Sequence, residues 1–234
     1  MQEQNFTMGI CLPEHSNKPY NFFNEESICL ADDVDIEKVS IRIKNHDPIF
    51  DIKEAAMNTV GKKWFEGKDL TEDLWFKYLI SEHSPIRSLD LRISFDGILY
   101  YNSVHYARHV HSIPYVTTHR PDRTKRERTI NDRVVHKADI NSQGLMDMFR
   151  KRLCVGSVDK ITHKIGVTLK TLMMNSDNYL LSQLGRVLVP NCIYRGGANS
   201  CPEFKECGLC NNLSNLEINS IKNRYDEYNK MMKK

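Results

Sequence analysis

Residues 105–128, HYARHVHSIPYVTTHRPDRTKRER, crowd histidine and arginine side chains among aromatic and β-branched ones. Arginine presents planar, paired donors that match a phosphate, and neutral histidine can donate to a carbonyl group or lie against a flat ring. These residue types suit the wall of a site for a flat, phosphorylated ligand. They also suit a solvated basic surface, because residues 120–133 carry six Lys or Arg beside three acids, and charge runs usually face water. From these residues alone, both interpretations stay open.

Four cysteines form a second chemically distinctive group, within the segment PNCIYRGGANSCPEFKECGLC (190–210). Their spacing is Cys-x8-Cys-x5-Cys-x2-Cys, and four thiolates at such short intervals can close a tetrahedral Zn²⁺ site. An iron–sulfur cluster uses the same ligands, and reduced thiols on a glycine-rich loop are the third interpretation. We predict a structural zinc site that pins the C-terminal segment, with the ligands Cys192, Cys201, Cys207 and Cys210.

Length and composition limit the class of protein. The chain has 234 residues, 40% of them hydrophobic, which suits one large domain or one domain with a small appendage. Its 33 Lys and Arg against 30 Asp and Glu give a net charge of +3, too balanced for a protein that coats nucleic acid. No apolar run approaches the ~20 residues of a membrane span, and residues 1–18 do not resemble a signal peptide. We expect a cytoplasmic protein with reduced cysteines, no membrane contact and no nucleic-acid partner.

Hydrophobic periodicity predicts the elements that must position these side chains. Alternating apolar and polar residues predict strands over 39–44 and 89–95, the second ending at the turn signal Asp96-Gly97. Residues 1–38 show no clean periodicity and are interpreted as an irregular extension. Apolar residues at helical spacing predict helices over 51–64, 70–80, 98–110, 141–153, 157–174 and 176–189, and the polar stretch 215–234 is typical of an amphipathic helix.

Helix caps and the fold class follow from the same pattern. We predict caps at Asp69 or Thr71, at Asn141 or Ser142, and at Ser176. Because most of the chain is helical and the two strands are separated by helices, we predict an α+β fold with a small sheet flanked by long helices. The expected parts are an N-terminal extension (1–38), a main domain (39–190), and a Cys-rich loop with a C-terminal helix (191–234).

The spacing of four residues carries a resemblance to a known family. Arg108-His109 is followed by Thr118 ten residues after the arginine, and by Arg120 twelve residues after it. This resembles the signature of the flavin-dependent thymidylate synthases, which reads Arg-His-Arg, then Ser at plus ten, then Arg at plus twelve.

Flanking segments extend the resemblance in the same order. SEHSPIRS (81–88) is similar to the family's His-x-Ser-Pro-Leu-Glu-His segment, and DPIFDIKEAAM (47–57) is similar to its first helix. MFRKRLCVGSVDKIT (148–162) resembles its Leu-Arg segment, with the family's Gln-Trp-Glu-Ile falling on 158–161. The resemblance therefore runs collinearly over residues 39–190.

This resemblance implies an activity. The family binds FAD and dUMP at the subunit interfaces of a homotetramer. It methylates dUMP to dTMP with a methylene group from methylenetetrahydrofolate and with hydride that NADPH first gives to the flavin. The chain is thus expected to be an FAD-dependent thymidylate synthase, a methyltransferase of nucleotide biosynthesis with a mostly antiparallel sheet.

The resemblance also implies roles for single residues. Arg152 falls on the arginine that meets the uracil edge, and it is the implied catalytic residue. Because arginine stays protonated at any working pH, its implied part is electrostatic stabilisation of an enolate-like uracil. His105 stands where the family has a glutamine that touches the nucleotide. The other implied contacts are Arg108, His109 and His83 with the flavin or its phosphates, and Thr118 and Arg120 with the phosphate of dUMP.

Two neighbouring residues have simpler interpretations beside these. Without the resemblance, Arg152 is interpreted as a charged surface residue in the Arg-Lys-Arg run 150–152. Cys154 is interpreted as a small apolar filler, because the family needs no cysteine nucleophile.

The chain departs from the family pattern at several positions. Val110 replaces the second arginine of the signature, and residues 113–116 replace its Ser-x-Asn-Glu portion, ending in Val116. Arg87 and Ser88 replace its Glu-His pair. Three outcomes are compatible with these changes: a diverged thymidylate synthase, a relative that transfers one carbon to another pyrimidine nucleotide, or a relative that has lost the flavin. A nucleic-acid-binding zinc module without catalysis is the alternative from another class.

Overall fold

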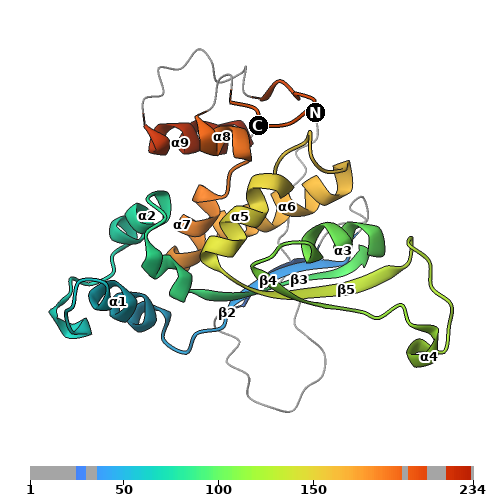
Figure 1. Ribbon diagram of the computed structural model, residues 1–234, viewed down its shortest axis with the longest axis horizontal. Helices are drawn as coiled ribbons and strands as arrows, with labels where there is room; N and C mark the ends of the chain where they lie inside the picture. The colour runs from blue at the N-terminus through green and yellow to red at the C-terminus, as the bar shows by residue number, and fades with distance from the viewer. Residues whose placement is uncertain (1–24, 30–35, 197–199, 210–219, 233–234) are drawn as a thin grey trace, which may run out of the picture.

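The computed structural model describes residues 25–29, 36–196, 200–209 and 220–232 of the chain. It has an α+β fold built on one antiparallel sheet, as the sequence predicts (Figure 1). The helices are α1 (Pro48–Asn58), α2 (Glu72–Ile80), α3 (Tyr100–Ala107), α4 (Pro121–Thr124), α5 (Ser142–Arg152), α6 (Lys160–Met174), α7 (Tyr179–Val187), α8 (Asn191–Arg195) and α9 (Ile221–Met232), with the 3-10 turns η2 (Trp64–Glu66) and η3 (Ser84–Ser88).

Five strands form the sheet, in the order β1-β2-β3-β5-β4, and each neighbouring pair is antiparallel. The strands predicted over 39–44 and 89–95 are confirmed as β2 and β3. The periodicity did not predict the other three, one of which falls in the extension that we expected to be irregular. The strands are β1 (Glu25–Cys29), β2 (Lys38–Ile43), β3 (Asp90–Leu99), β4 (Ser112–Val116) and β5 (Arg133–Asn141).

Strand β3 is longer than predicted because Asp96-Gly97 forms an irregularity within it. The register with β5 shifts between Phe95 and Ile98, and Gly97 has a φ of +79°, a left-handed conformation that glycine adopts readily. The strand then continues to Leu99 and leads directly into α3. The predicted turn is therefore wrong, and the extra residues of β3 carry the chain to the start of α3.

Helix starts agree with the predicted caps at two places and differ at others. The side chains of Thr71 and Asn141 accept from backbone N–H groups and cap α2 and α5, as predicted. Asp159 caps α6, two residues after the predicted start. Asn178, not Ser176, caps α7. The helix predicted over 51–64 starts earlier, at Pro48, because Asp47 caps it and a proline is favoured in the first turn.

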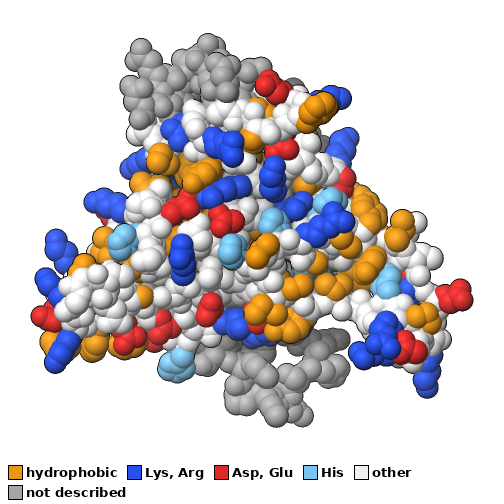
Figure 2. Space-filling model, in the orientation of Figure 1, with side chains coloured by type: hydrophobic (Ala, Val, Ile, Leu, Met, Phe, Trp, Pro, Cys, Tyr) orange, Lys and Arg blue, Asp and Glu red, His pale blue; other side chains and the backbone are white. Residues whose placement is uncertain are grey.

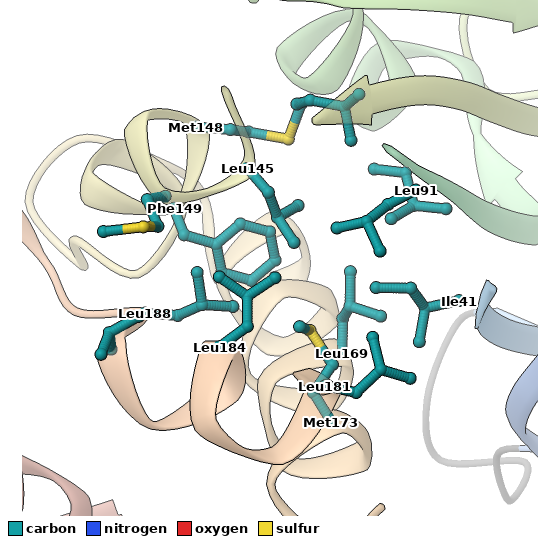
Figure 3. Packing of buried hydrophobic residues seen from close by; sticks show 14 of the residues in the cluster. Ile41, Leu91, Leu145, Met148, Phe149, Leu169, Met173, Leu181, Leu184 and Leu188 are labelled. Carbon is teal, nitrogen blue, oxygen red and sulfur yellow. The ribbon is translucent and has the colours of Figure 1, made fainter. Parts of the chain in front are cut away.

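The hydrophobic core lies between the sheet and the layer formed by α5, α6 and α7 (Figure 3). Ile41 and Leu91 from the sheet face Leu145 and Phe149 of α5, and Leu169 of α6 completes this contact. All five side chains are fully buried, and each contributes about 1.5–3 kcal/mol relative to an exposed side chain. This core fixes the helices that carry the candidate site.

The C-terminal helix packs on the main domain. Tyr225 and Tyr228 of α9 are buried in the same core, and Arg224 donates to the backbone carbonyl of Ile193 in α8 at 3.0 Å. Most of the extension 1–38 lies outside the described residues. None of the helices described here combines the length and the hydrophobicity that crossing a bilayer requires.

Candidate active site

Two strand–helix units bring three of the predicted site residues together. α3 follows β3, so that His105 lies in its last turn and Arg108 and His109 follow at its C-terminus. α5 follows β5 and ends at Arg152. β3 and β5 are neighbours in the sheet, and the C-terminal ends of the two helices meet over one of its faces (Figure 1). Basic (Lys or Arg) and histidine side chains gather over these helices in the surface view (Figure 2).

Arg152 occupies the point where the helices meet, and it is only 8% exposed. Its Nε donates to Nε2 of His109 over 3.0 Å, and its Nη1 lies 3.3 Å from Nδ1 of His105. In the described part of the chain, Arg152 forms no ion pair with a carboxylate. The interpretation of Arg152 as a surface charge is therefore wrong. We refer to Arg152, His105 and His109 as the arginine–histidine cluster.

We infer the protonation of both histidines from the geometry of the cluster. A guanidinium can only donate hydrogen bonds, so each ring nitrogen that faces it must carry a lone pair. This assigns the Nδ1–H tautomer to His109 and the Nε2–H tautomer to His105. The Nε2 of His105 lies 3.6 Å from Oδ2 of Asp159. Nη2 of Arg152 has no hydrogen-bond partner among the residues that the structure describes, so it is available to a ligand.

Burial and the neighbouring cation keep the two histidines neutral. Burial lowers the pKa of His109 to about 4, and the charges of Arg152 and His111 act in the same direction. Burial and Arg152 also lower the pKa of His105, although Asp159 opposes them. Burial lowers the pKa of Arg152, yet a guanidinium remains protonated near neutral pH. The cluster is thus a partly desolvated cation between two neutral rings, an arrangement that favours an anionic or carbonyl oxygen.

A buried network, which the sequence analysis missed, holds the cluster in place. Oδ1 of Asp159 accepts from the backbone N–H groups of Ile161 and Thr162, each at 3.0 Å. The fully buried Asn102 donates to Asp159 Oδ1 and to Thr162 Oγ1, also at 3.0 Å. The hydroxyl of Tyr106 donates to the Thr162 carbonyl at 2.8 Å. The sequence signal that could have found Asp159 is its position near the start of a predicted helix.

Thr118 and Arg120 lie together, but on a separate feature. They belong to the arm, residues 117–132 between β4 and β5, which projects from the body and carries α4 (Figure 1). The backbone N–H of Arg120 donates to Oγ1 of Thr118 at 3.2 Å, and its guanidinium pairs with Asp122 at 2.6 and 3.1 Å. No hydrogen bond or ion pair of the described residues joins Thr118 or Arg120 to the cluster of the same chain.

His83 lies at the start of η3, where it is exposed and stacks on Tyr78 with 5.3 Å between ring centroids. It does not join the cluster through any hydrogen bond within the described ranges. The preceding residue, Glu82, pairs with Arg150 of α5. A pocket of about 380 Å³ opens here, beside the start of α5, and we refer to it as the η3 pocket. It is lined by Glu82, Arg87, His111, Asn141, Gln143, Gly144 and Asp147.

The predicted zinc ligands are only partly described. Cys192 is buried in α8, Cys201 is half-buried and Cys207 is exposed, whereas Cys210 lies outside the described residues. Within the described ranges, no three His, Cys, Asp or Glu side chains are placed as a metal-binding group. The zinc site therefore stays a prediction. Cys154 is buried, and burial raises the pKa of its thiol, as expected of an apolar filler.

Comparisons with known proteins give a distant structural likeness and no sequence match. No protein-family model matches the chain, and no curated protein matches it either. Among solved structures, the chain is similar to the crystal structure of thymidylate synthase X from Helicobacter pylori with FAD and dUMP. The sequence identity is 13%, the TM-score is 0.46, and the likeness covers 62% of this chain and 97% of that one. A likeness at this level assigns neither ligand nor activity to this chain.

Proposed function

We propose that this protein is a flavin-dependent thymidylate synthase, which reductively methylates dUMP to dTMP. The contact of Arg152 with His105 and His109 is the observation that carries the proposal. These residues lie 47 and 43 positions from Arg152 in sequence, and their side chains meet. The sequence resemblance, which does not depend on these contacts, implies that all three residues belong to one site for nucleotide and flavin.

Arg152 is suited to the electrostatic part of this reaction. Carbon C5 of uracil becomes nucleophilic as negative charge develops on a ring carbonyl oxygen. A guanidinium that is 8% exposed stabilises such charge more strongly than one in water, because solvent screens it less. Neutral His105 and His109 leave the positive charge of Arg152 uncompensated, so that a developing oxyanion is its natural partner.

The donors near the cluster fit a phosphate-bearing flavin cofactor. Arg87 and His111 both line the η3 pocket. Val110 is 92% exposed and brings no charge where the family has an arginine, so we infer that Arg87 supplies a replacement cation. When bound, FAD supplies the redox chemistry of the reaction.

Further ligands follow from the resemblance. We assign Arg108, His109 and His83 to the flavin. NADPH is the proposed reductant and methylenetetrahydrofolate the proposed one-carbon donor.

The arm is proposed to bind the phosphate of dUMP in a neighbouring protomer. Arg120 and Thr118 supply a guanidinium and a hydroxyl two residues apart, which together suit one phosphate group. The arm projects from its own body (Figure 1), which supports a contact between its tip and another copy of the chain. We therefore propose a homotetramer in which each site combines a cluster from one protomer with an arm from another.

Product analysis tests the proposed function. The purified chain is incubated with dUMP, methylenetetrahydrofolate, NADPH and FAD, and nucleotides are separated by chromatography. We expect dTMP to form only when dUMP, methylenetetrahydrofolate and NADPH are all present, with FAD either retained by the protein or added. Formation of a methylated product from dCMP or UMP instead would move the substrate to another pyrimidine nucleotide, and no product from any of the three would contradict the function.

A further inference from the structure

Asp159 and His105 form a pair behind Arg152. Oδ2 of Asp159 lies 3.6 Å from Nε2 of His105, and Nδ1 on the other side of the ring lies 3.3 Å from Nη1 of Arg152. The imidazole thus connects a carboxylate to a guanidinium. The side chain of His105 is 31% exposed and that of Asp159 35%, so the pair borders solvent while Arg152 is buried.

Asp159 is held rigidly and in its charged form. Oδ1 accepts three hydrogen bonds, from Ile161, Thr162 and Asn102, and Oδ2 accepts one from the Thr162 hydroxyl at 2.6 Å. Burial raises the pKa of this carboxyl, but the hydrogen bonds from Thr162 and Ile161 outweigh it and leave the pKa below its usual value. The remaining acceptor direction of Oδ2 faces His105.

We propose that Asp159 is a positioning residue, which holds His105 in the Nε2–H tautomer so that Nδ1 accepts from Arg152 and Nη2 of Arg152 is directed to the ligand. The identity of that ligand as a pyrimidine nucleotide rests on the proposed function. The relationship between the three side chains rests on their geometry alone. The family has glutamine at the position of His105, and an amide needs no such partner because it has no tautomers to choose between.

Capping of α6 does not by itself explain the position of Asp159. Oδ1 accepts from the backbone N–H groups of α6, whereas Oδ2 accepts from the Thr162 hydroxyl at 2.6 Å and also lies 3.6 Å from Nε2 of His105. The variant Asp159→Asn separates helix capping from the contact with His105, because the carbonyl oxygen of asparagine can still cap the helix. Its NH₂ group would then face His105 and favour a lone pair on Nε2. The proton of His105 would then move to Nδ1. The Nδ1–H group would face the N–H of Nη1 in Arg152, so that two hydrogen-bond donors would oppose each other.

The first test is ¹⁵N NMR of the full chain labelled on histidine, with the His105 signals assigned by their loss in His105→Gln. In the unchanged protein we expect Nε2 to carry the proton and Nδ1 to carry the lone pair. In Asp159→Asn we expect the populations of the two tautomers to reverse. Asp47→Asn is the matched control, because Asp47 caps α1 through Oδ1 and has no histidine partner among the described residues.

The second test is a double-mutant cycle on the dissociation constant of dUMP. We expect Asp159→Asn to weaken dUMP binding about tenfold, and to have no further effect in the His105→Gln background. An unchanged tautomer in Asp159→Asn, or an equal loss of affinity in both backgrounds, would overturn the proposal. If the tautomer reverses in Asp159→Asn while the unchanged protein binds neither dUMP nor FAD, that result would support the positioning role of Asp159 and contradict the proposed function.

Discussion

Nε of Arg152 donates to Nε2 of His109 across 3.0 Å, although 43 residues separate them. The contact requires a neutral imidazole, and burial supplies one by lowering the pKa of His109 to about 4. The result is a buried cation whose neighbours do not cancel its charge. An oxyanion that forms in the transition state would meet that charge at close range in a medium that screens it weakly.

The first prediction concerns the charge of Arg152. We expect Arg152→Ala to lower the rate of dTMP formation about 10³-fold while FAD stays bound, because the lost group acts on the nucleotide. Steady-state kinetics and the flavin absorbance of the purified variant measure both effects. Lys151→Ala in the same helix is the control, since Lys151 points to Glu203. Unchanged turnover in Arg152→Ala would remove Arg152 from the reaction.

The second prediction concerns the arm. We expect Arg120→Ala to weaken dUMP binding about 10- to 100-fold with little change in FAD affinity, because one charge-assisted contact to phosphate is lost. Asp122→Asn should act in the opposite direction, since Asp122 now pairs with the Arg120 guanidinium. Isothermal titration calorimetry measures both affinities. Equal affinity for dUMP in Arg120→Ala and the unchanged protein would exclude Arg120 from the phosphate site.

Subunit mixing checks whether the arm serves a neighbour. Arg120→Ala and Arg152→Ala are each expected to be impaired alone. Coexpressed, they should regain activity at about a quarter of the sites, because random assembly pairs an intact arm with an intact cluster that often. Absence of any recovery in mixed assemblies would show that each site is built within one protomer.

The third prediction concerns acid stability and His136, which is fully buried and packs against Phe95 and Tyr106. Neither ring nitrogen has a hydrogen-bond partner among the described residues, and burial lowers the pKa of His136 from 6.5 to about 4. The unfolded chain therefore binds a proton between these pH values that the folded chain does not. Stability is full above pH 6.5 and declines towards pH 4, by about 3 kcal/mol for this group.

Chemical denaturation at several pH values measures this decline. We expect His136→Phe to make the decline smaller without abolishing it, since the pKa values of His109, His105 and His163 are also lowered in the folded chain. His46→Gln, a change at an exposed histidine, should leave the pH dependence as it is. A His136→Phe protein with the same dependence as the unchanged protein would mean that His136 titrates normally.

The fourth prediction concerns Lys170, which is fully buried between α6 and the helices that follow it. Burial and the charge of Arg186 lower the pKa of Lys170 from 10.5 to about 7. Between these pH values the unfolded chain binds a proton that the folded chain does not, so the folded protein loses stability as the pH falls from 10.5 to 7. Its Nζ donates to the carbonyl of Gly185 at 2.7 Å, which also accepts from the N–H of Leu188. In Lys170→Met we expect a flat stability profile over this range, with equal or higher stability at pH 7. A marked loss at pH 7 would show that the hydrogen bond outweighs the cost of the buried amine.

The fifth prediction concerns the cysteines near the C-terminus. We expect about one zinc ion per chain by elemental analysis, and a lower melting temperature after chelation, because a structural zinc site contributes directly to folding. Cys207→Ser should lose the metal, whereas Cys154→Ser should keep it. Iron in place of zinc would identify a cluster, and no metal in protein purified under reducing conditions would leave only reduced thiols.

Sequence reasoning predicted the helices better than it predicted the sheet. Helices α5 and α6 were predicted within a few residues, because they have clear helical spacing and polar caps. Arg108, Thr118 and Arg120 were assigned from the spacing of a family signature, and their roles stay predictions. Strand β5 was missed although its residues alternate, because its N-terminal half follows a long charged segment that hides the pattern. Strand β4 was also missed. It lies at the edge of the sheet and contains Pro114 and an exposed Ile113, so its residues do not show the pattern expected of a strand.

The burial of Arg152 could not be predicted from its neighbours. Arg150 and Lys151 precede it, and all three look alike in sequence. The structure separates them because Arg150 pairs with Glu82 and Lys151 with Glu203, whereas only Arg152 turns towards α3. Asp159 was overlooked for a similar reason. A carboxylate that caps a helix gives no sign in the sequence that its second oxygen faces a histidine 54 residues earlier.

The most direct measurement is the absorption spectrum of the purified protein with FAD, recorded before and after addition of dUMP. We predict that the protein retains the flavin and that its visible band shifts when dUMP binds, because the proposed function brings both ligands to the arginine–histidine cluster. The shift should be absent with Arg152→Ala. The proposed function would be contradicted if the protein did not retain FAD, or if the absorption band of the bound flavin did not change when dUMP was added.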